Sequence, residues 1–178
     1  MPQNKNNSSE LVRCLERSHQ ETLLKTNGFY ETLLKLRYEG KPSLGKNLRA
    51  ADEVLKFFHG EHKQHMNCEE NVIFPFLMIH VPKLESVIQV LRADHHDFKN
   101  KLQVFENLIA ELAKDRTDFD HAAVLEKIRE VGTYMIYLLR SHNQFESSSI
   151  HKVMETQLHA DEIEELQSKV ENYNPQRQ

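Results

Sequence analysis

The residues best suited to chemistry in this chain are histidines and glutamates that interrupt apolar helical stripes. Each of four stripes contains a histidine near its middle, and two of these histidines are followed by a glutamate four residues later. That spacing places both side chains on one helix face, about one turn apart. The six residues are His19, His65, Glu69, His95, His142 and Glu146.

These six residues form two matching sets along the chain. His19 and His95 are 76 residues apart, and His65 and His142 are 77 residues apart, so each half contributes a lone histidine and a His-x-x-x-Glu pair. Buried carboxylates are costly unless they are paired or coordinated. A satisfied core histidine or a buried His–Glu ion pair would explain any single position, but two matching halves indicate a metal centre.

The ligand types narrow the choice of metal. Four histidines and two glutamates exceed the four ligands of a structural zinc site and include no thiolate. Imidazole with carboxylate suits iron, manganese or zinc, and two carboxylates between two histidine pairs suit two ions. We expect one ion at His19 and His65, a second at His95 and His142, and Glu69 and Glu146 spanning both.

Helical periodicity predicts the elements that position these residues. The chain contains only 5 Gly and 5 Pro, which favours helices. We predict an all-α fold, an antiparallel up-down-up-down four-helix bundle within a single domain over residues 1–178 with its core at about 9–155. The expected helices cover about 9–37, 46–80, 82–114 and 118–155, followed by an extra helical segment at 156–172 and a tail at 173–178.

Several local signals set the expected boundaries. Glu39 to Ser43 is predicted to form a loop, and Pro75 to kink or end the second helix. Thr117 or Asp118 is the expected cap of the fourth helix. Beyond Gly28, the first helix is expected to continue its buried face with Tyr30, Leu33 and Leu34.

Composition excludes several classes of function. The net charge of −4 and the pI near 6.3 provide no basic surface for nucleic acid. No apolar run reaches the roughly 18–20 residues that cross a bilayer, and the first residues do not resemble a signal peptide. Cys14 and Cys68 are too few for a disulfide framework. We therefore expect a cytoplasmic protein.

Several other polar residues lie close in sequence to the predicted ligands. His62 or Glu61 could complete the site, although a supporting or half-exposed position for His62 is the stronger expectation. Glu70 is expected to point to solvent, and His96 to lie on a surface face beside His95. The remaining histidines are expected to be exposed or at helix ends: His59, His80, His121, His151 and His159.

The motif His-Met-Asn-Cys-Glu-Glu-Asn-Val-Ile-Phe-Pro at residues 65–75 resembles the His-x-x-x-Glu-Glu motif of hemerythrin-like, or HHE cation-binding, domains. The similarity covers about residues 10–155. The other matching parts are His19 in the first helix, Asp94-His95 with Phe98 and Leu102 in the third, and His142-x-x-x-Glu146 in the fourth.

The resemblance implies a non-haem di-iron centre, oxo- or hydroxo-bridged, that binds dioxygen or senses it or nitric oxide. Hemerythrins proper carry a second histidine four residues after the third-helix one, and here that position is Lys99. The second ion would then have an open position, or a single metal would bind. Zinc or manganese could replace iron.

Two other functions remain open. A metal-dependent oxidoreductase, or an enzyme that handles peroxide or nitric oxide, would use the open position at the second ion. In a regulatory interaction module, the metal would only stabilise the bundle, and a partner would bind through the segment at 156–172. The oligomeric state is open in each case.

Overall fold

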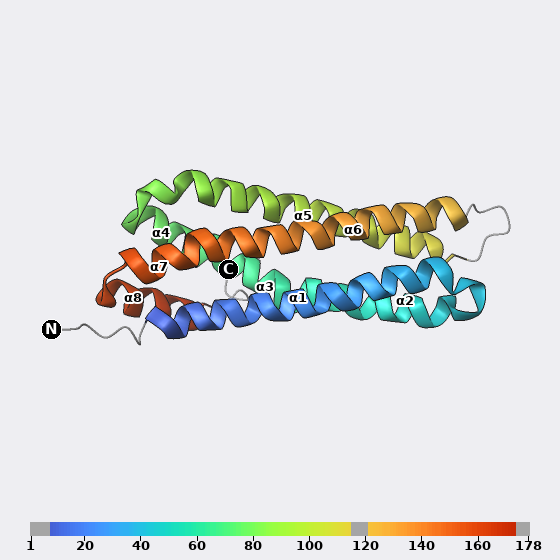
Figure 1. Ribbon diagram of the computed structural model, residues 1–178, viewed down its shortest axis with the longest axis horizontal. Coiled ribbons are helices and arrows are strands. Elements are labelled where there is room, and N and C mark those ends of the chain that lie inside the picture. Colours follow the sequence, from blue (N-terminus) through green and yellow to red (C-terminus); the bar gives the residue numbers. More distant parts are fainter. Residues whose placement is uncertain (1–7, 115–120, 174–178) are drawn as a thin grey trace.

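The computed structural model describes residues 8–114 and 121–173, and all regular structure in these ranges is helical (Figure 1). The turns η1, η2 and η4 are π-helical, and η3 is a 3-10 turn. The elements are α1 (Ser8–Tyr38), α2 (Gly40–Phe57), η1 (Phe58–His62), α3 (Lys63–Cys68), η2 (Glu69–Ile73), α4 (Phe74–His80), η3 (Pro82–Leu84), α5 (Glu85–Leu112), α6 (His121–Glu146), η4 (Ser147–His151), α7 (Lys152–Gln157) and α8 (Ala160–Glu171).

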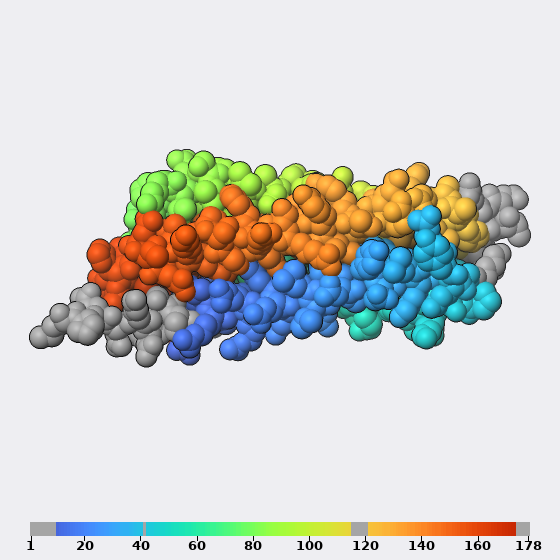
Figure 2. Space-filling model, in the orientation of Figure 1, coloured from blue at the N-terminus to red at the C-terminus, as the bar shows by residue number. Residues whose placement is uncertain are grey.

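The long helices lie along the long axis of the molecule and form a helical bundle. Helix α1 packs against α2 and α6, and α5 packs against α6. Figure 2 shows α6 and α1 side by side over most of the visible face. The predicted all-helical fold is confirmed. None of the described helices combines the length and apolar character that a membrane span requires.

The connection between α1 and α2 is shorter than predicted. The expected loop from Glu39 to Ser43 is reduced to Glu39, and α2 begins at Gly40 rather than near residue 46. Gly40 has a φ of 68°, a backbone conformation that glycine adopts without the steric cost of a side chain. Pro42 lies in the first turn of α2, where a missing N–H is tolerated.

The buried face of α1 also differs from the prediction. Tyr30 is 46% exposed, whereas Phe29 is fully buried. An α-helix returns to one face after alternating steps of three and four residues, and the buried threonines Thr22 and Thr26 occupy this face between His19 and Phe29. Their hydroxyls donate hydrogen bonds to backbone carbonyls of the preceding turn, which allows these two polar residues to lie on the buried face of the helix.

The predicted second helix is a series of α-helical segments separated by π-helical turns, from α2 to α4. Pro75 is the second residue of α4, and α4 follows η2 directly. The α-helical hydrogen-bond pattern is already interrupted there, so Pro75 does not end the helix, which continues to His80.

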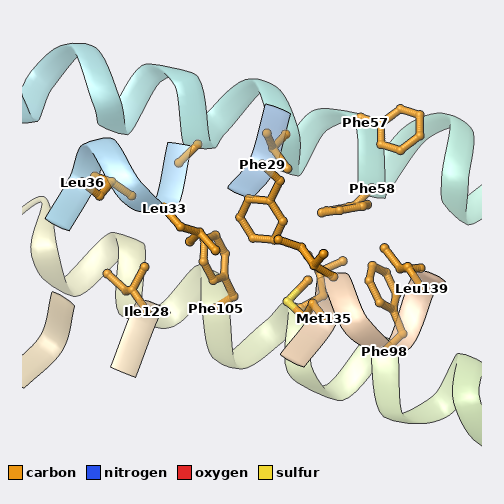
Figure 3. Close-up of a cluster of buried hydrophobic side chains, with 14 of the residues drawn as sticks. Phe29, Leu33, Leu36, Phe57, Phe58, Phe98, Phe105, Ile128, Met135 and Leu139 are labelled. Atoms are coloured by element: carbon orange, nitrogen blue, oxygen red, sulfur yellow. The ribbon is translucent and has the colours of Figure 1, made fainter. Parts of the chain in front are cut away.

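Two hydrophobic clusters form the core, one towards each end of the bundle. In the first, the rings of Phe29, Phe58, Phe98 and Phe105 meet edge to face, beside Met135 (Figure 3). The second cluster includes Ile73, Leu77, Ile88, Leu91, Ile150 and Leu166. The six candidate ligands lie between residues of the two clusters along their helices, so they form a polar layer with apolar packing on both sides.

The C-terminal segment packs onto the second cluster. Helix α7 ends at Gln157, Leu158 is extended, and α8 starts at Ala160 rather than near 156. The backbone N–H of His159 donates to Glu162 at 2.7 Å and caps α8, whose Ile163 and Leu166 are buried. The expected cap at Thr117 or Asp118 and the tail beyond residue 173 lie outside the described residues.

Candidate metal centre

The structure brings all six sequence-predicted residues together in the polar layer. They form two groups, and within each group the potential ligand atoms lie within 4.8 Å of one another. The first donor group contains His19 of α1, His65 of α3, Glu69 of η2 and Glu146 of α6; the second donor group contains Glu69, His95 of α5 and His142 of α6.

Glu69 belongs to both groups because its two oxygens face different histidines. Oε1 lies 2.7 Å from Nε2 of His65 and 4.0 Å from Nε2 of His19. Oε2 lies 3.2 Å from Nε2 of His95. The side chain of Glu69 is completely buried. One carboxylate therefore has an oxygen available on each side of the cluster.

Glu146 approaches the cluster from α6. Its Oε2 lies 3.1 Å from Nε2 of His19 and 3.5 Å from Nε2 of His142. In the second donor group, Nε2 of His95 and Nε2 of His142 face each other at 3.3 Å. Glu146 belongs only to the first donor group, although its Oε2 also faces His142.

The donor atoms of the first group are close together without forming hydrogen bonds. Nε2 of His19, Nε2 of His65 and both oxygens of Glu69 and Glu146 have no hydrogen-bond partner among the described residues. Such buried polar atoms are costly. Two donors that each lie about 2.1 Å from one ion are about 3 to 4 Å apart, and most of the separations given above are in or near this range. The residues present therefore fit a bound cation.

Charge is stabilised in the cluster on both carboxylates and imidazoles. Burial alone would favour neutral Glu69, but His65 and His95 hold the pKa of this carboxyl well below its usual range. Burial opposes charge on His65 and His95 as well, but Glu69 raises the pKa of both imidazoles. Asp94 and Glu146 overcome burial at His142 and raise its pKa to about 10.

Two carboxylates outside the donor groups contact the far nitrogens of His95 and His142. Nδ1 of His95 lies 2.8 Å from Oε1 of Glu70, and Nδ1 of His142 lies 3.4 Å from Oδ2 of Asp94. The prediction that Glu70 points to solvent is wrong. Contact with His95 lowers the pKa of Glu70 to about 2. Carboxylates in this position fix the orientation of metal-binding imidazoles.

Lys99, at the position of the extra hemerythrin histidine, contacts this outer layer. Its Nζ donates to Oε1 of Glu70 at 3.0 Å, and its side chain is 41% exposed. Lys99 thus shares a carboxylate with His95 and supplies no donor atom to either group.

The two candidate additions to the site have different outcomes. Glu61 is exposed, so it does not face the cluster. His62 is buried, and neither ring nitrogen has a partner among the described residues. It packs against Phe57 and Phe98, and its ring centroid lies 6.3 Å from that of His65, but neither of its nitrogens lies within 4.0 Å of a carboxylate oxygen of the cluster. Burial holds the pKa of His62 well below its usual range.

His151 is the main residue that the sequence interpretation missed. It was expected at an exposed or helix-end position, but it is buried at 2% exposure. Its ring stacks on His19, with 5.0 Å between ring centroids, and its Nε2 lies 3.7 Å from Oε1 of Glu146. Among the other histidines, His59, His96 and His159 are exposed as predicted, and the half-buried His80 and His121 lie at helix ends, also as predicted.

The π-helical turns are concentrated at the cluster. Glu69 begins η2, and η4 follows Glu146 directly. A π-helical turn makes i→i+5 hydrogen bonds and shifts the following residues relative to an α-helix. These turns therefore decide which side chains after each glutamate point inward.

A surface pocket of about 490 Å³ between α1 and α6 reaches the cluster at His19. Its lining includes Gln20, Arg140, Asn143 and Ser147. Oγ of Ser147 lies 3.4 Å from Nδ1 of His19. The polar layer is thus adjacent to a hollow on the molecular surface.

The comparison with protein families agrees with this geometry. The family model of the hemerythrin HHE cation-binding domain matches residues 11–154, which contain all six candidate ligands. The chain therefore belongs to the hemerythrin HHE cation-binding domain family. No curated protein matches the chain significantly.

Proposed function

We propose that this protein holds a non-haem di-iron centre that binds dioxygen or a related small diatomic such as nitric oxide. The proposed scaffold is an up-down-up-down antiparallel four-helix bundle. One observation carries the proposal: two buried donor groups share the carboxylate of Glu69, with an oxygen available to each. A single-ion site would not require this sharing.

The proposed roles follow from the contacts in the cluster. His19 and His65, in the first donor group, would hold one ion, and His95 and His142, in the second, would hold the other. Glu69 and Glu146 would supply carboxylate oxygens to both ions. When bound, two iron ions supply reversible redox chemistry towards a diatomic ligand. Glu70 and Asp94 orient the imidazoles of the second ion through their Nδ1 atoms.

Two further features of the chain support a small ligand rather than a large substrate. The donor atoms are almost completely buried between two hydrophobic clusters, which limits the water and the size of molecules that reach them. The pocket beside His19 is the proposed route of access.

Absorption spectroscopy of the iron-loaded protein tests this function. We expect oxygen-dependent charge-transfer bands that disappear on reduction, or a new band with nitric oxide. His95→Ala should lose these bands, whereas His96→Ala, at the exposed neighbouring position, should keep them. A protein that retains two iron ions and shows no spectral response to either gas would contradict the proposal.

An enzyme that oxidises a substrate or handles peroxide or nitric oxide is the second candidate. Lys99 favours it, because this side chain pairs with Glu70 and leaves a coordination position of the second ion without a protein ligand. Catalytic consumption of peroxide or nitric oxide by the iron-loaded protein would support the enzyme. Reversible binding without turnover would exclude it.

An interaction module based on the C-terminal segment has less support. Such a module would need an exposed apolar face on the segment at 156–172, but Ile163 and Leu166 of this segment are buried in the second cluster. Helix α8 therefore uses this face within the chain.

A further inference from the structure

His151 is buried at the edge of the first donor group, and the hydrogen-bonding capacity of both its ring nitrogens is unused among the described residues. Nδ1 and Nε2 both lack a hydrogen-bond partner in the described part of the chain. A buried imidazole loses its hydrogen bonds to water, and the cost persists unless another partner replaces them. The position of His151 therefore requires an explanation that apolar packing does not provide.

The orientation of Glu146 shows what His151 faces. Oε2 of Glu146 lies towards His19 and His142, at 3.1 and 3.5 Å. Oε1 lies 3.7 Å from Nε2 of His151 and has no hydrogen-bond partner among the described residues. This separation is too long for a hydrogen bond but falls within the range of about 3 to 4 Å expected for two donors on one ion.

The π-helical turn η4 explains how His151 reaches this position. His151 is five residues after Glu146, and in an α-helix it would point roughly 140° away from that glutamate. A π-helical turn makes i→i+5 hydrogen bonds and rotates less per residue than an α-helix, so it brings His151 back towards the side of Glu146. The ring then lies nearly parallel to that of His19, with 19° between their planes. His151 thus borders the first donor group beside its member His19, although it is not itself within the 4.8 Å grouping.

We propose that Nε2 of His151 is an additional ligand of the ion held by His19 and His65. This inference rests on the proposed di-iron function. The first ion would then be held by three histidines, and the second by His95 and His142. Lys99 does not add a ligand to the second ion, because its ammonium group is paired with Glu70. The second ion would then have one histidine fewer than the first, which would leave room there for a small exogenous ligand.

Proton NMR of the cobalt(II)-loaded protein tests this assignment. Each cobalt-bound histidine contributes one strongly shifted, solvent-exchangeable ring N–H signal. We expect five such signals in the wild type, from His19, His65, His95, His142 and His151. Four signals in a wild type that retains two cobalt ions would overturn the assignment and leave the proposed di-metal centre intact.

Two matched variants identify the fifth signal. His151→Phe keeps a ring but removes both nitrogens, so it should lose one signal and weaken one of the two cobalt sites by at least about 10-fold. His62→Phe is the control, because His62 is equally buried with unpartnered nitrogens but packs among phenylalanines. Loss of the signal in His62→Phe rather than in His151→Phe would overturn the assignment.

The number of shifted N–H signals in the wild type does not depend on whether either variant folds. A wild type that binds neither cobalt nor iron would instead refute the proposed function itself. The two failures are therefore distinguishable.

Discussion

The imidazole of His95 donates a hydrogen bond from Nδ1 to Oε1 of Glu70 at 2.8 Å. Its other nitrogen, Nε2, faces Oε2 of the neighbouring residue Glu69 at 3.2 Å. Adjacent carboxylates on one helical segment therefore contact both nitrogens of the same ring. This arrangement fixes the orientation of the ring and directs Nε2 into the cluster.

Removal of Glu70 should weaken metal binding without removing a ligand. We expect Glu70→Ala to lower metal affinity about 10–100-fold, because the ring of His95 loses its orienting acceptor. Glu70→Gln should have a smaller effect, since an amide oxygen still accepts the bond. Competition with a chelator measures the change. Glu106→Ala is the control, because Glu106 contacts the exposed His59; equal affinities in Glu70→Ala and Glu106→Ala would contradict the assigned role.

Metal uptake should release protons even above the ordinary pKa of histidine, 6.5. A raised pKa keeps an imidazole protonated above that pH, and metal binding requires the neutral ring. The pKa of His142 is raised to about 10, so at pH 8 its proton must leave when the metal binds, and apparent affinity should rise with pH through this range. Calorimetry in buffers of different ionisation enthalpy measures the release.

Asp94→Asn provides the internal comparison for this proton release. The carboxylate of Asp94 contributes to the raised pKa of His142, so its neutralisation should lower that pKa and decrease the release at pH 8. A release that is the same in wild type and Asp94→Asn would show that the proton comes from another group.

Close packing of α6 against α1 should make Gly132 intolerant of a side chain. A Cβ at Gly132 would lie 2.7 Å from both methyl carbons of Leu33. Overpacking of the core costs about 1–3 kcal/mol, whereas replacement of a helical glycine by alanine gains about 1 kcal/mol from helix propensity. Because the cost is the larger of the two, Gly132→Ala should lower the free energy of unfolding. Gly28→Ala has open space and should raise it by about 0.5–1 kcal/mol. Urea denaturation of both variants checks the opposite signs, and a stabilising Gly132→Ala would contradict the packing.

Helix α8 should contribute to the stability of the bundle. Leu166 is fully buried in the second cluster, so Leu166→Ala should lower the free energy of unfolding by about 2–5 kcal/mol. Leu24→Ala, at a residue that is 70% exposed, should change it by less than about 0.5 kcal/mol. Equal denaturation midpoints for the two variants would show that α8 is not part of the cooperative core.

The sequence predicted the polar layer because its members interrupt long, regular apolar stripes. On α5 the stripe from Ile88 to Phe105 is apolar except for His95, and this face is buried as predicted. On α6 the spacing of His142 and Glu146 precedes the π-helical turn, so α-helical periodicity still applies. The positions of these residues followed from local periodicity alone.

Residues beyond a change in helical geometry could not be placed in the same way. His151 lies at the end of η4, and α-helical periodicity directs it away from the cluster. No local sequence signal indicates a π-helical turn, although a histidine five residues after a candidate ligand would justify considering one. Glu70 was missed for another reason, because its partner His95 is 25 residues away and on a different helix. The face of α1 was misread because buried Thr22 and Thr26 are polar.

Anaerobic titration of the metal-free protein with iron(II), followed by removal of unbound metal and elemental analysis, tests the central claim most directly. The account predicts two retained iron ions per chain, and a loss of retained iron in both His65→Ala and Glu146→Ala. Less than one equivalent in the folded wild type, or the same retention in both variants as in wild type, would contradict a di-iron centre at these residues.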